Sequence, residues 1–314
     1  MKVSIVCPLY NASKYIEDLN LNLLKQEKKE IDELEVVYVL TRSKDNTKEL
    51  LEKNNLKYIE IEANDFSHSL TRESVGRKLS CDILVFISQD VIMKDNKWLI
   101  NLVRPIINGE AQASFSRQIC KFDNIEKYTR ENNYPEQSRI VGKDDIEKYG
   151  LLTFFYSDAS SAVKKSVYDE LKAYDNKDLI INEDMYFAHK LILASYKIKY
   201  CADSQIYHSH DFTLKQLYQR YFDTGVFFTQ NPKLKEYGSN ESGLGLAKYV
   251  FKRASSEKNI KVLLSILPNF GARFIGKMLG EHYKKLPKKF IINSSNSYIV
   301  YFSKFFYNFI NFFF

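Results

Sequence analysis

The sequence has few of the residues that mark unusual protein classes. Its 314 residues include 11 glycines and 6 prolines, which excludes a collagen-like chain or one dominated by flexible linkers. The four cysteines form no Cys-x-x-Cys pair, so we expect buried thiols rather than a disulfide framework or a zinc site. The N-terminal apolar run is too short for a signal peptide, and no window of about 20 residues is apolar enough to span a bilayer. We therefore expect a cytoplasmic protein.

Composition and charge narrow the possible partners. Hydrophobic residues make up 45% of the chain and charged residues 27%, which is typical of a globular protein and excludes extensive disorder. The net charge of +7 permits an anionic partner, namely nucleic acid, a phosphorylated substrate or an acidic membrane. Basic and aromatic residues do not interleave in a recognisable module, and acidic residues number 39. We therefore expect no nucleic-acid partner.

Short apolar runs alternate with stretches of helical periodicity over the first 115 residues. The predicted strands are residues 3–7, 34–40, 57–62, 83–87 and 113–115. The predicted helices between them are residues 16–23, 47–53, 70–79 and 98–107. This alternation indicates an α/β fold with a mostly parallel central sheet covered on both faces. Residues 117–150 are polar and aperiodic, and we expect them to form a partly helical insertion over the sheet edge.

Helical patterns return in the second half of the chain. The predicted helices are residues 164–172, 182–194, 214–228 and much of 244–286. We divide the chain into residues 1–230, an α/β domain, and residues 231–314, a helical extension with a basic and aromatic tail.

Two groups of residues have the chemistry of a cation site. Asp90 ends the apolar strand in Ser88-Gln89-Asp90, and ligands bind beyond the carboxyl ends of parallel strands, where a carboxylate can hold Mg²⁺. In an extended segment, His208 and His210 lie on one face and can share a metal or a phosphate. The alternatives are that Asp90 caps a turn, and that one histidine lies in the core and the other on the surface.

Two further groups lie at predicted helix starts. Asn182-Glu183-Asp184 can cap a helix and place acids in its first turn, or can present a general base to an acceptor hydroxyl. Phe66–Arg72 places a hydroxyl, an imidazole and a guanidinium near a helix N-terminus, where anions bind. The alternative for Phe66–Arg72 is a capped helix with a solvated arginine.

The order of these groups along the chain resembles that of the family 2 glycosyltransferases, which have the GT-A fold. The resemblance is to the rhamnosyltransferase branch and covers about residues 1–230. The segments that carry it are residues 3–11, 66–72, 88–90, 158–165, 183–184, 207–214 and 220–225. Two positions depart from the family pattern. Leu40 stands where the family has an aspartate that helps to read the base, and Ser88 replaces the first acid of an Asp-x-Asp motif.

The resemblance implies roles for individual residues. Asp184, or its neighbour Glu183, would be the catalytic base. Asp90, His208 and His210 would hold Mg²⁺ or Mn²⁺. The expected donor-binding residues are Pro8, Tyr10, Asn11, Arg42, His68, Arg72, Gln89 and Asp90. Asp158 and Ser161 are expected to contact the sugar or the acceptor.

The resemblance also implies an inverting transfer of L-rhamnose from dTDP-rhamnose. The acceptor would be a hydroxyl of a lipid-linked or oligosaccharide intermediate in bacterial surface polysaccharide synthesis, at the cytoplasmic face of the inner membrane. Two other functions stay open. One is a metal-dependent hydrolase that uses Asp90, Asp184, His208 and His210, and the other is a non-catalytic sugar-nucleotide binder.

The C-terminal tail has an amphipathic pattern. Read as a helix, residues 298–314 place Phe302, Phe305, Phe306, Phe309 and Phe313 on one face. With the lysines upstream, this pattern predicts a helix that lies in a membrane interface. The alternative is a helix that docks its phenylalanines onto this protein or onto a second subunit.

Overall fold

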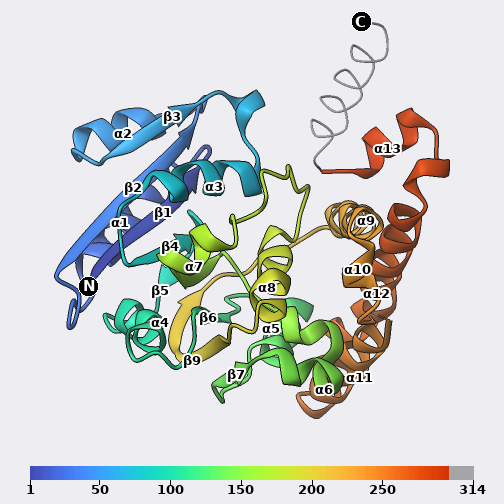
Figure 1. The fold of residues 1–314 in the computed structure, drawn as a ribbon. Helices are drawn as coiled ribbons and strands as arrows, with labels where there is room; N and C mark the ends of the chain where they lie inside the picture. The colour runs from blue at the N-terminus through green and yellow to red at the C-terminus, as the bar shows by residue number, and fades with distance from the viewer. Residues whose placement is uncertain (239, 297–314) are drawn as a thin grey trace, which may run out of the picture. The chain divides into compact units, whose positions relative to one another are not determined.

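The computed structural model describes residues 1–238 and 240–296 (Figure 1). Contacts within the chain group it into two compact units, each of which is described by itself. The first unit comprises residues 1–123, 130–177 and 183–209. The second unit comprises residues 124–129, 178–182 and the chain from His210 onward.

The first four strands of the first unit form a parallel sheet, as the sequence predicted. Strand β1 (Lys2–Leu9) lies between β2 (Glu33–Thr41) and β4 (Ile83–Ile87), and β3 (Tyr58–Ile61) pairs with the far edge of β2. The helices that join these strands and follow β4 are α1 (Ile16–Leu24), α2 (Thr47–Lys53), α3 (His68–Lys78) and α4 (Trp98–Ile107). Every residue of β4 is buried, in keeping with its uninterrupted apolar sequence.

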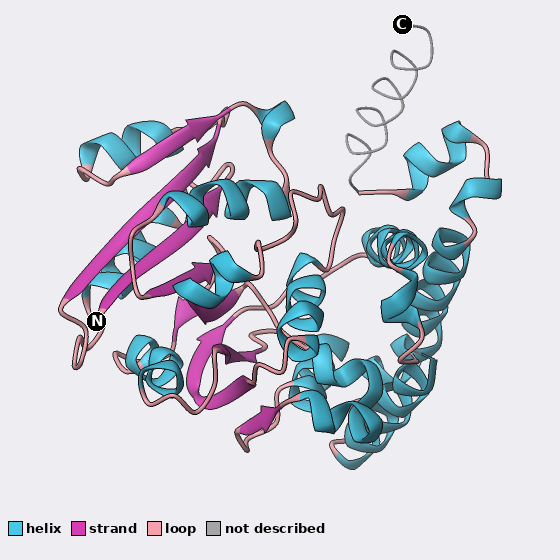
Figure 2. Cartoon of the chain, in the orientation of Figure 1, coloured by secondary structure: helices cyan, strands magenta, loops and turns pink. Residues whose placement is uncertain are grey.

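The remaining strands make the sheet mixed. Strand β8 (Ser160–Lys164) pairs antiparallel with both β4 and β6 (Ala113–Ile119). Strand β9 (Ile198–Tyr207) is parallel to β6, and the short strands β5 (Ile92–Met93) and β7 (Arg139–Val141) pair antiparallel with β9. The nine strands form one sheet with flanking helices (Figure 2). The sheet is therefore parallel among β1 to β4 and in the β6–β9 pair, whereas the pairings of β5, β7 and β8 are antiparallel.

The polar stretch after β6 contains more regular structure than its sequence indicated. It holds helix α5 (Ile125–Asn133), strand β7 and helix α6 (Ile146–Tyr149), so the expected insertion is partly helical but also adds a strand to the sheet edge. Helix α7 (Lys165–Glu170) follows β8 directly, and α8 (Glu183–Leu193) precedes β9.

The second unit is helical. It contains α9 (Leu214–Gln230), α10 (Pro232–Lys235), α11 (Asn240–Ser256), α12 (Ile260–Glu281) and α13 (Lys288–Ser294). Helices α9 and α12 pack along each other, and their backbones meet at three glycines, Gly225, Gly276 and Gly280. This packing places α9 with the C-terminal helices, whereas the sequence-based division at residue 230 placed it with the α/β domain.

Helix α12 corrects one expectation. Its length and composition are sufficient to cross a membrane, whereas the sequence had indicated that no segment was apolar enough. The predicted amphipathic helix over residues 298–314 lies outside the residues that the structure describes.

Candidate active site

The carboxyl ends of β1, β2 and β4 meet at one edge of the sheet. Leu9 at the end of β1 pairs with Leu40 of β2, and Val6 pairs with Phe86 of β4. The loops that follow these strands therefore emerge together, at the place where open α/β sheets bind ligands.

Side chains tie these loops to one another. Gln89, after β4, accepts a hydrogen bond from the backbone N–H of Tyr10 at 2.8 Å and donates one to the Tyr10 carbonyl at 3.0 Å. Asn11 donates its backbone N–H to Ser43 Oγ at 2.9 Å, and its Oδ1 accepts from the Lys44 N–H at 3.2 Å. The structure thus brings together the predicted donor residues Tyr10, Asn11 and Gln89, next to Pro8 at the end of β1.

Arg42 lies at the same edge but makes contacts at the surface. Its side chain is 62% exposed and forms ion pairs with Glu60 at 3.4 Å and Glu62 at 2.8 Å. Its predicted contact with the donor stays a prediction.

Strand pairing brings Asp90 to His208 from 118 positions away in the sequence. Ile92 of β5 pairs with Tyr207 at the end of β9, so the residues just outside this pair become neighbours. Asp90 Oδ1 lies 3.6 Å from His208 Nε2. His210 is joined to His208 through Ser209 alone, and one ligand atom from each of Asp90, His208 and His210 lies within 4.8 Å of the others.

The other ring nitrogen of His208 is held by Gln118. His208 Nδ1 and Gln118 Oε1 are 2.8 Å apart, and an amide oxygen can only accept, so Nδ1 carries the proton. Nε2 then offers a lone pair on the side of Asp90. Arg130 donates to the same Gln118 oxygen, and Gln118 Nε2 donates to Ser157 Oγ at 2.8 Å. A ligand histidine oriented through its second nitrogen is the usual arrangement at protein metal sites, so these residues fit a divalent cation.

A second cluster forms around Arg72 on α3. Arg72 Nη1 lies 3.0 Å from Glu183 Oε1, and the two side chains are 6% and 11% exposed. The same nitrogen donates to the His68 carbonyl at 2.9 Å. Ser67 caps α3 by accepting from the Leu70 N–H, so the capped helix of the alternative interpretation is present. The alternative of a solvated arginine is wrong, because this guanidinium is buried against a carboxylate.

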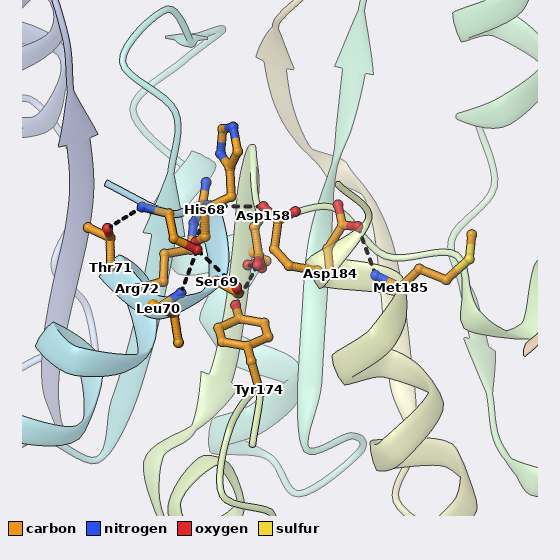
Figure 3. Close-up of polar contacts among 12 residues, drawn as sticks. His68, Ser69, Leu70, Thr71, Arg72, Asp158, Tyr174, Asp184 and Met185 are labelled. Carbon is orange, nitrogen blue, oxygen red and sulfur yellow. Dashed lines mark hydrogen bonds and ion pairs between the residues drawn. The ribbon is translucent and has the colours of Figure 1, made fainter. Parts of the chain in front are cut away.

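Asp158 and Asp184 complete this cluster. Asp158 is buried and accepts hydrogen bonds from the Tyr174 and Ser161 hydroxyls, both at 2.7 Å. Asp184, in the first turn of α8, is partly exposed and accepts from the backbone N–H of Met185 at 2.8 Å. Figure 3 shows Tyr174 pointing its hydroxyl at Asp158 and Asp184 pointing to Met185.

The cluster raises the pKa of its aspartates. Asp184 is partly exposed as a residue, but desolvation of its carboxyl raises the pKa of Asp184 well above its usual range, and the neighbouring charges of Glu183 and Asp158 add to the shift. Burial also raises the pKa of Asp158, while Arg72 lowers it. One guanidinium faces three carboxylates here, and the repulsion among the carboxylates favours proton uptake by the group. A carboxyl whose pKa lies above its usual range suits a general base.

The two clusters lie near one strand. Burial raises the pKa of the Cys7 thiol on β1, Arg72 lowers it and Asp90 raises it. Both charged groups therefore act on the same residue of β1.

Ser161 and Asp158 were predicted to contact the sugar or the acceptor. Both are buried and bond to each other, and Asp158 belongs to the cluster around Arg72. Contact with sugar or acceptor stays a prediction for both.

Three positioning residues were missed in the sequence. Gln118 lies in a polar stretch with no motif, and Tyr174 lies in a loop. The third, Glu73, has an Oε2 that accepts from the backbone N–H groups of Tyr174 and Asn176, at 3.2 and 3.1 Å. Local sequence carries no signal for contacts like these, which join residues about 100 positions apart.

Comparisons with known proteins bear on this site and fold. Residues 4–172 match the family model described as glycosyl transferase family 2. The chain is 33% identical over 293 residues to the O-antigen chain rhamnosyltransferase RfbN of Salmonella typhimurium, which covers 91% of this chain and 92% of that protein. It is 28% identical over 289 residues to the O-antigen chain rhamnosyltransferase WbaN of Salmonella anatum, which covers 90% of each.

A solved structure is similar in fold. The mannosyltransferase PcManGT from Pyrobaculum calidifontis, in complex with GDP-Man and Mn²⁺, superposes with a TM-score of 0.57 at 14% identity. The match covers 90% of this chain and 86% of that one.

Proposed function

Because the chain belongs to glycosyl transferase family 2 and has the GT-A fold, we propose that it transfers L-rhamnose from dTDP-rhamnose in O-antigen synthesis. The acceptor is a hydroxyl group of a lipid-linked or oligosaccharide intermediate, at the cytoplasmic face of the inner membrane. The names of two relatives that match nine-tenths of the chain support the sugar and the pathway. The similarity to a structure with a bound nucleotide-sugar supports the class of donor.

The observation that carries the proposed reaction is the position of Asp184 in the first turn of α8, next to Glu183, whose carboxylate is held by the buried Arg72. In this reaction Asp184 removes the proton of the acceptor hydroxyl while the oxygen of that hydroxyl bonds to the anomeric carbon. The bond from that carbon to the diphosphate breaks on the opposite face, which inverts the configuration. Glu183 is the less suitable base because Arg72 already holds its carboxylate at 3.0 Å.

Asp90 and His208, together with His210, would hold the divalent cation. The carboxylate suits Mg²⁺ or Mn²⁺, and the imidazoles favour Mn²⁺ because Mg²⁺ prefers oxygen ligands. When bound, the cation supplies positive charge for the departing diphosphate. Gln118 orients His208 for this role.

The donor would lie over the loops after β1, β2 and β4. Tyr10 is exposed and can stack on the base, while Gln89 holds its backbone in place. Arg42 and His68 are the remaining candidates for contacts with the donor. Asp158 is the candidate for contact with the sugar or the acceptor, and Ser161 and Tyr174 orient its carboxylate through hydrogen bonds.

The test begins with donor binding. Thermal unfolding of the purified protein is measured with dTDP, UDP and GDP, each with and without Mn²⁺. A nucleotide at 100 times its dissociation constant stabilises the folded state by about 2.7 kcal/mol. We expect dTDP with Mn²⁺ to give the largest shift, and a larger shift with UDP or GDP would contradict the proposed donor.

The second step compares two isosteric variants in a transfer assay with dTDP-rhamnose. Asp184→Asn should lose turnover by about 10²–10⁴-fold, the usual contribution of a general base, and should still bind dTDP. Glu183→Gln should stay active. Because it removes a like charge beside Asp184, the pKa of Asp184 falls and the acid limb of the pH profile of kcat/KM moves to lower pH.

Other outcomes point to other functions. Release of rhamnose without an acceptor, at the rate seen with one, would indicate a hydrolase. Full activity in both variants would remove the base from this cluster.

A further inference from the structure

Helix α12 exposes a continuous apolar stripe in the described part of the second unit. We define the α12 stripe as Ile260, Leu264, Leu267, Phe274, Ile275 and Met278, all of which are exposed. Leu264, Leu267 and Phe274 are 75%, 84% and 67% exposed. At about 100° per residue these side chains fall within an arc of about 100°, and the stripe is about 27 Å long at a rise of about 1.5 Å per residue.

The opposite face of α12 is committed to α9. Gly276 and Gly280 meet the backbone of α9, and Arg273 donates to Tyr221 of α9 at 2.9 Å and to Asn269 of its own helix at 2.8 Å. A helix with a buried arginine and asparagine on one face is unsuited to cross a bilayer, although its length is sufficient. It is suited to lie flat at an interface.

Helix α11 also exposes apolar side chains. It packs on α12 through a small core of Val250, Ala254 and Val262. Two of its other apolar side chains, Leu244 and Phe251, are exposed.

The charge of this region is strongly positive. Residues 243–296 contain eleven lysines and arginines and two acidic residues, although the whole chain has a net charge of only +7. The rest of the chain is therefore net negative. Exposed lysines lie at both ends of the α12 stripe, with Lys258 and Lys261 at its start and Lys284 and Lys285 beyond its end.

We propose that the α12 stripe binds the surface of an anionic lipid bilayer, with the helix lying in the plane of the interface. The stripe enters the boundary between headgroups and acyl chains, while the flanking lysines contact anionic headgroups. This inference rests on the proposed function in one respect: a lipid-linked acceptor is presented at such a surface.

The basic flanks favour lipid over protein as the occupant. Protein interfaces are depleted in lysine relative to the rest of the surface, whereas peripheral membrane helices combine an apolar face with lysines and arginines. A second copy of this chain would bring the same positive charge to the contact and repel it.

Vesicle flotation of the full-length protein tests this surface. The vesicles contain either phosphatidylcholine alone or phosphatidylcholine with phosphatidylglycerol. The test variant is Leu267→Gln with Phe274→Gln, which removes apolar character and leaves the charge unchanged. The matched control is Leu21→Gln with Leu24→Gln on α1, where both leucines are also exposed.

We expect the wild type and the α1 control to float with the anionic vesicles and not with the neutral ones. The α12 variant should lose at least tenfold in partitioning, while its thermal stabilisation by dTDP and its melting temperature stay as in the wild type. Flotation needs no sugar transfer, so failure of the proposed reaction would leave this result intact.

Three results would overturn the inference. The first is that the wild type does not float. The second is that the α12 variant floats like the control. If Phe305→Gln with Phe309→Gln abolishes flotation instead, the C-terminal tail is the anchor. The third is that light scattering shows the wild type as a dimer and the α12 variant as a monomer that floats as well as the wild type. This result would assign the stripe to contact with a second copy of the chain.

Discussion

Removal of the Arg72 guanidinium should cost far more stability than removal of an exposed arginine. In Arg72→Met the carboxylate of Glu183, 11% exposed and 3.0 Å from Arg72 in the wild type, loses its cation. Loss of one partner from a buried ion pair costs about 3–5 kcal/mol, because the remaining charge stays desolvated. Arg42→Met is the matched control, since Arg42 is 62% exposed and surface pairs contribute about 0–1 kcal/mol.

Urea unfolding followed by tryptophan fluorescence measures both variants. The chain has one tryptophan, Trp98, which is fully buried in the first unit, so its emission reports on the unit that contains Arg72. The double variant Arg72→Met with Glu183→Gln removes the orphaned charge and should recover part of the lost free energy. The reasoning is refuted if Arg72→Met and Arg42→Met differ by less than about 1 kcal/mol, or if the double variant is less stable than Arg72→Met.

Three further predictions concern packing, pH and the cation. Gly280→Ala should destabilise the protein by about 1–3 kcal/mol, because the new Cβ would lie 2.0 Å from the Phe222 carbonyl oxygen. Gly271→Ala on the same helix is the control, since its Cβ would meet nothing within 4 Å, and it should be neutral or stabilising. Equal melting temperatures of the two variants would contradict this prediction. Burial raises the pKa of Asp223 from 3.8 to about 6, so the folded state binds the proton more tightly than the unfolded state does. This proton contributes about 3 kcal/mol to the free energy of unfolding below pH 4, and the contribution is lost as the pH rises through 6. Asp223→Asn should lack this dependence in urea titrations from pH 4 to 7, and an unchanged slope would rule out the assignment. Gln118→Leu should weaken Mn²⁺ binding about 10–100-fold by releasing His208, as calorimetry with the metal alone would detect; an unchanged affinity would mean that Gln118 does not position the ligand.

Much of the first unit was predictable because its elements are local patterns. The strand at residues 83–87 and the helices at 47–53 and 98–107 have the bounds that the sequence predicted. Each is an uninterrupted apolar run or a clear helical period, so neighbouring residues carry the signal. Asp90 after β4 was found because ligand sites lie beyond strand ends, and strand ends follow from sequence. The residues after β1 were named from the resemblance to the family.

Strand β8 shows what local patterns miss. Ser160 and Ser161 are buried there, and they read as polar positions in the sequence. Ser160 accepts from Trp98 Nε1 at 2.9 Å and Ser161 donates to Asp158 at 2.7 Å. These partners satisfy the hydroxyls in the core, and Trp98 lies 62 positions away from Ser160 in the sequence. The antiparallel strand, and with it the mixed sheet, was therefore invisible in the sequence.

The sequence by itself determined the parallel half of the sheet, the helical C-terminal part and the residue types available for catalysis. The tertiary structure alone decided which of those residues meet. Arg72 reaches Glu183 across 111 positions and His208 reaches Gln118 across 90, and both contacts depend on how distant elements pack and in what register. Periodicity describes which face of an element is buried, but the partner of a buried charge is set by the element that covers it.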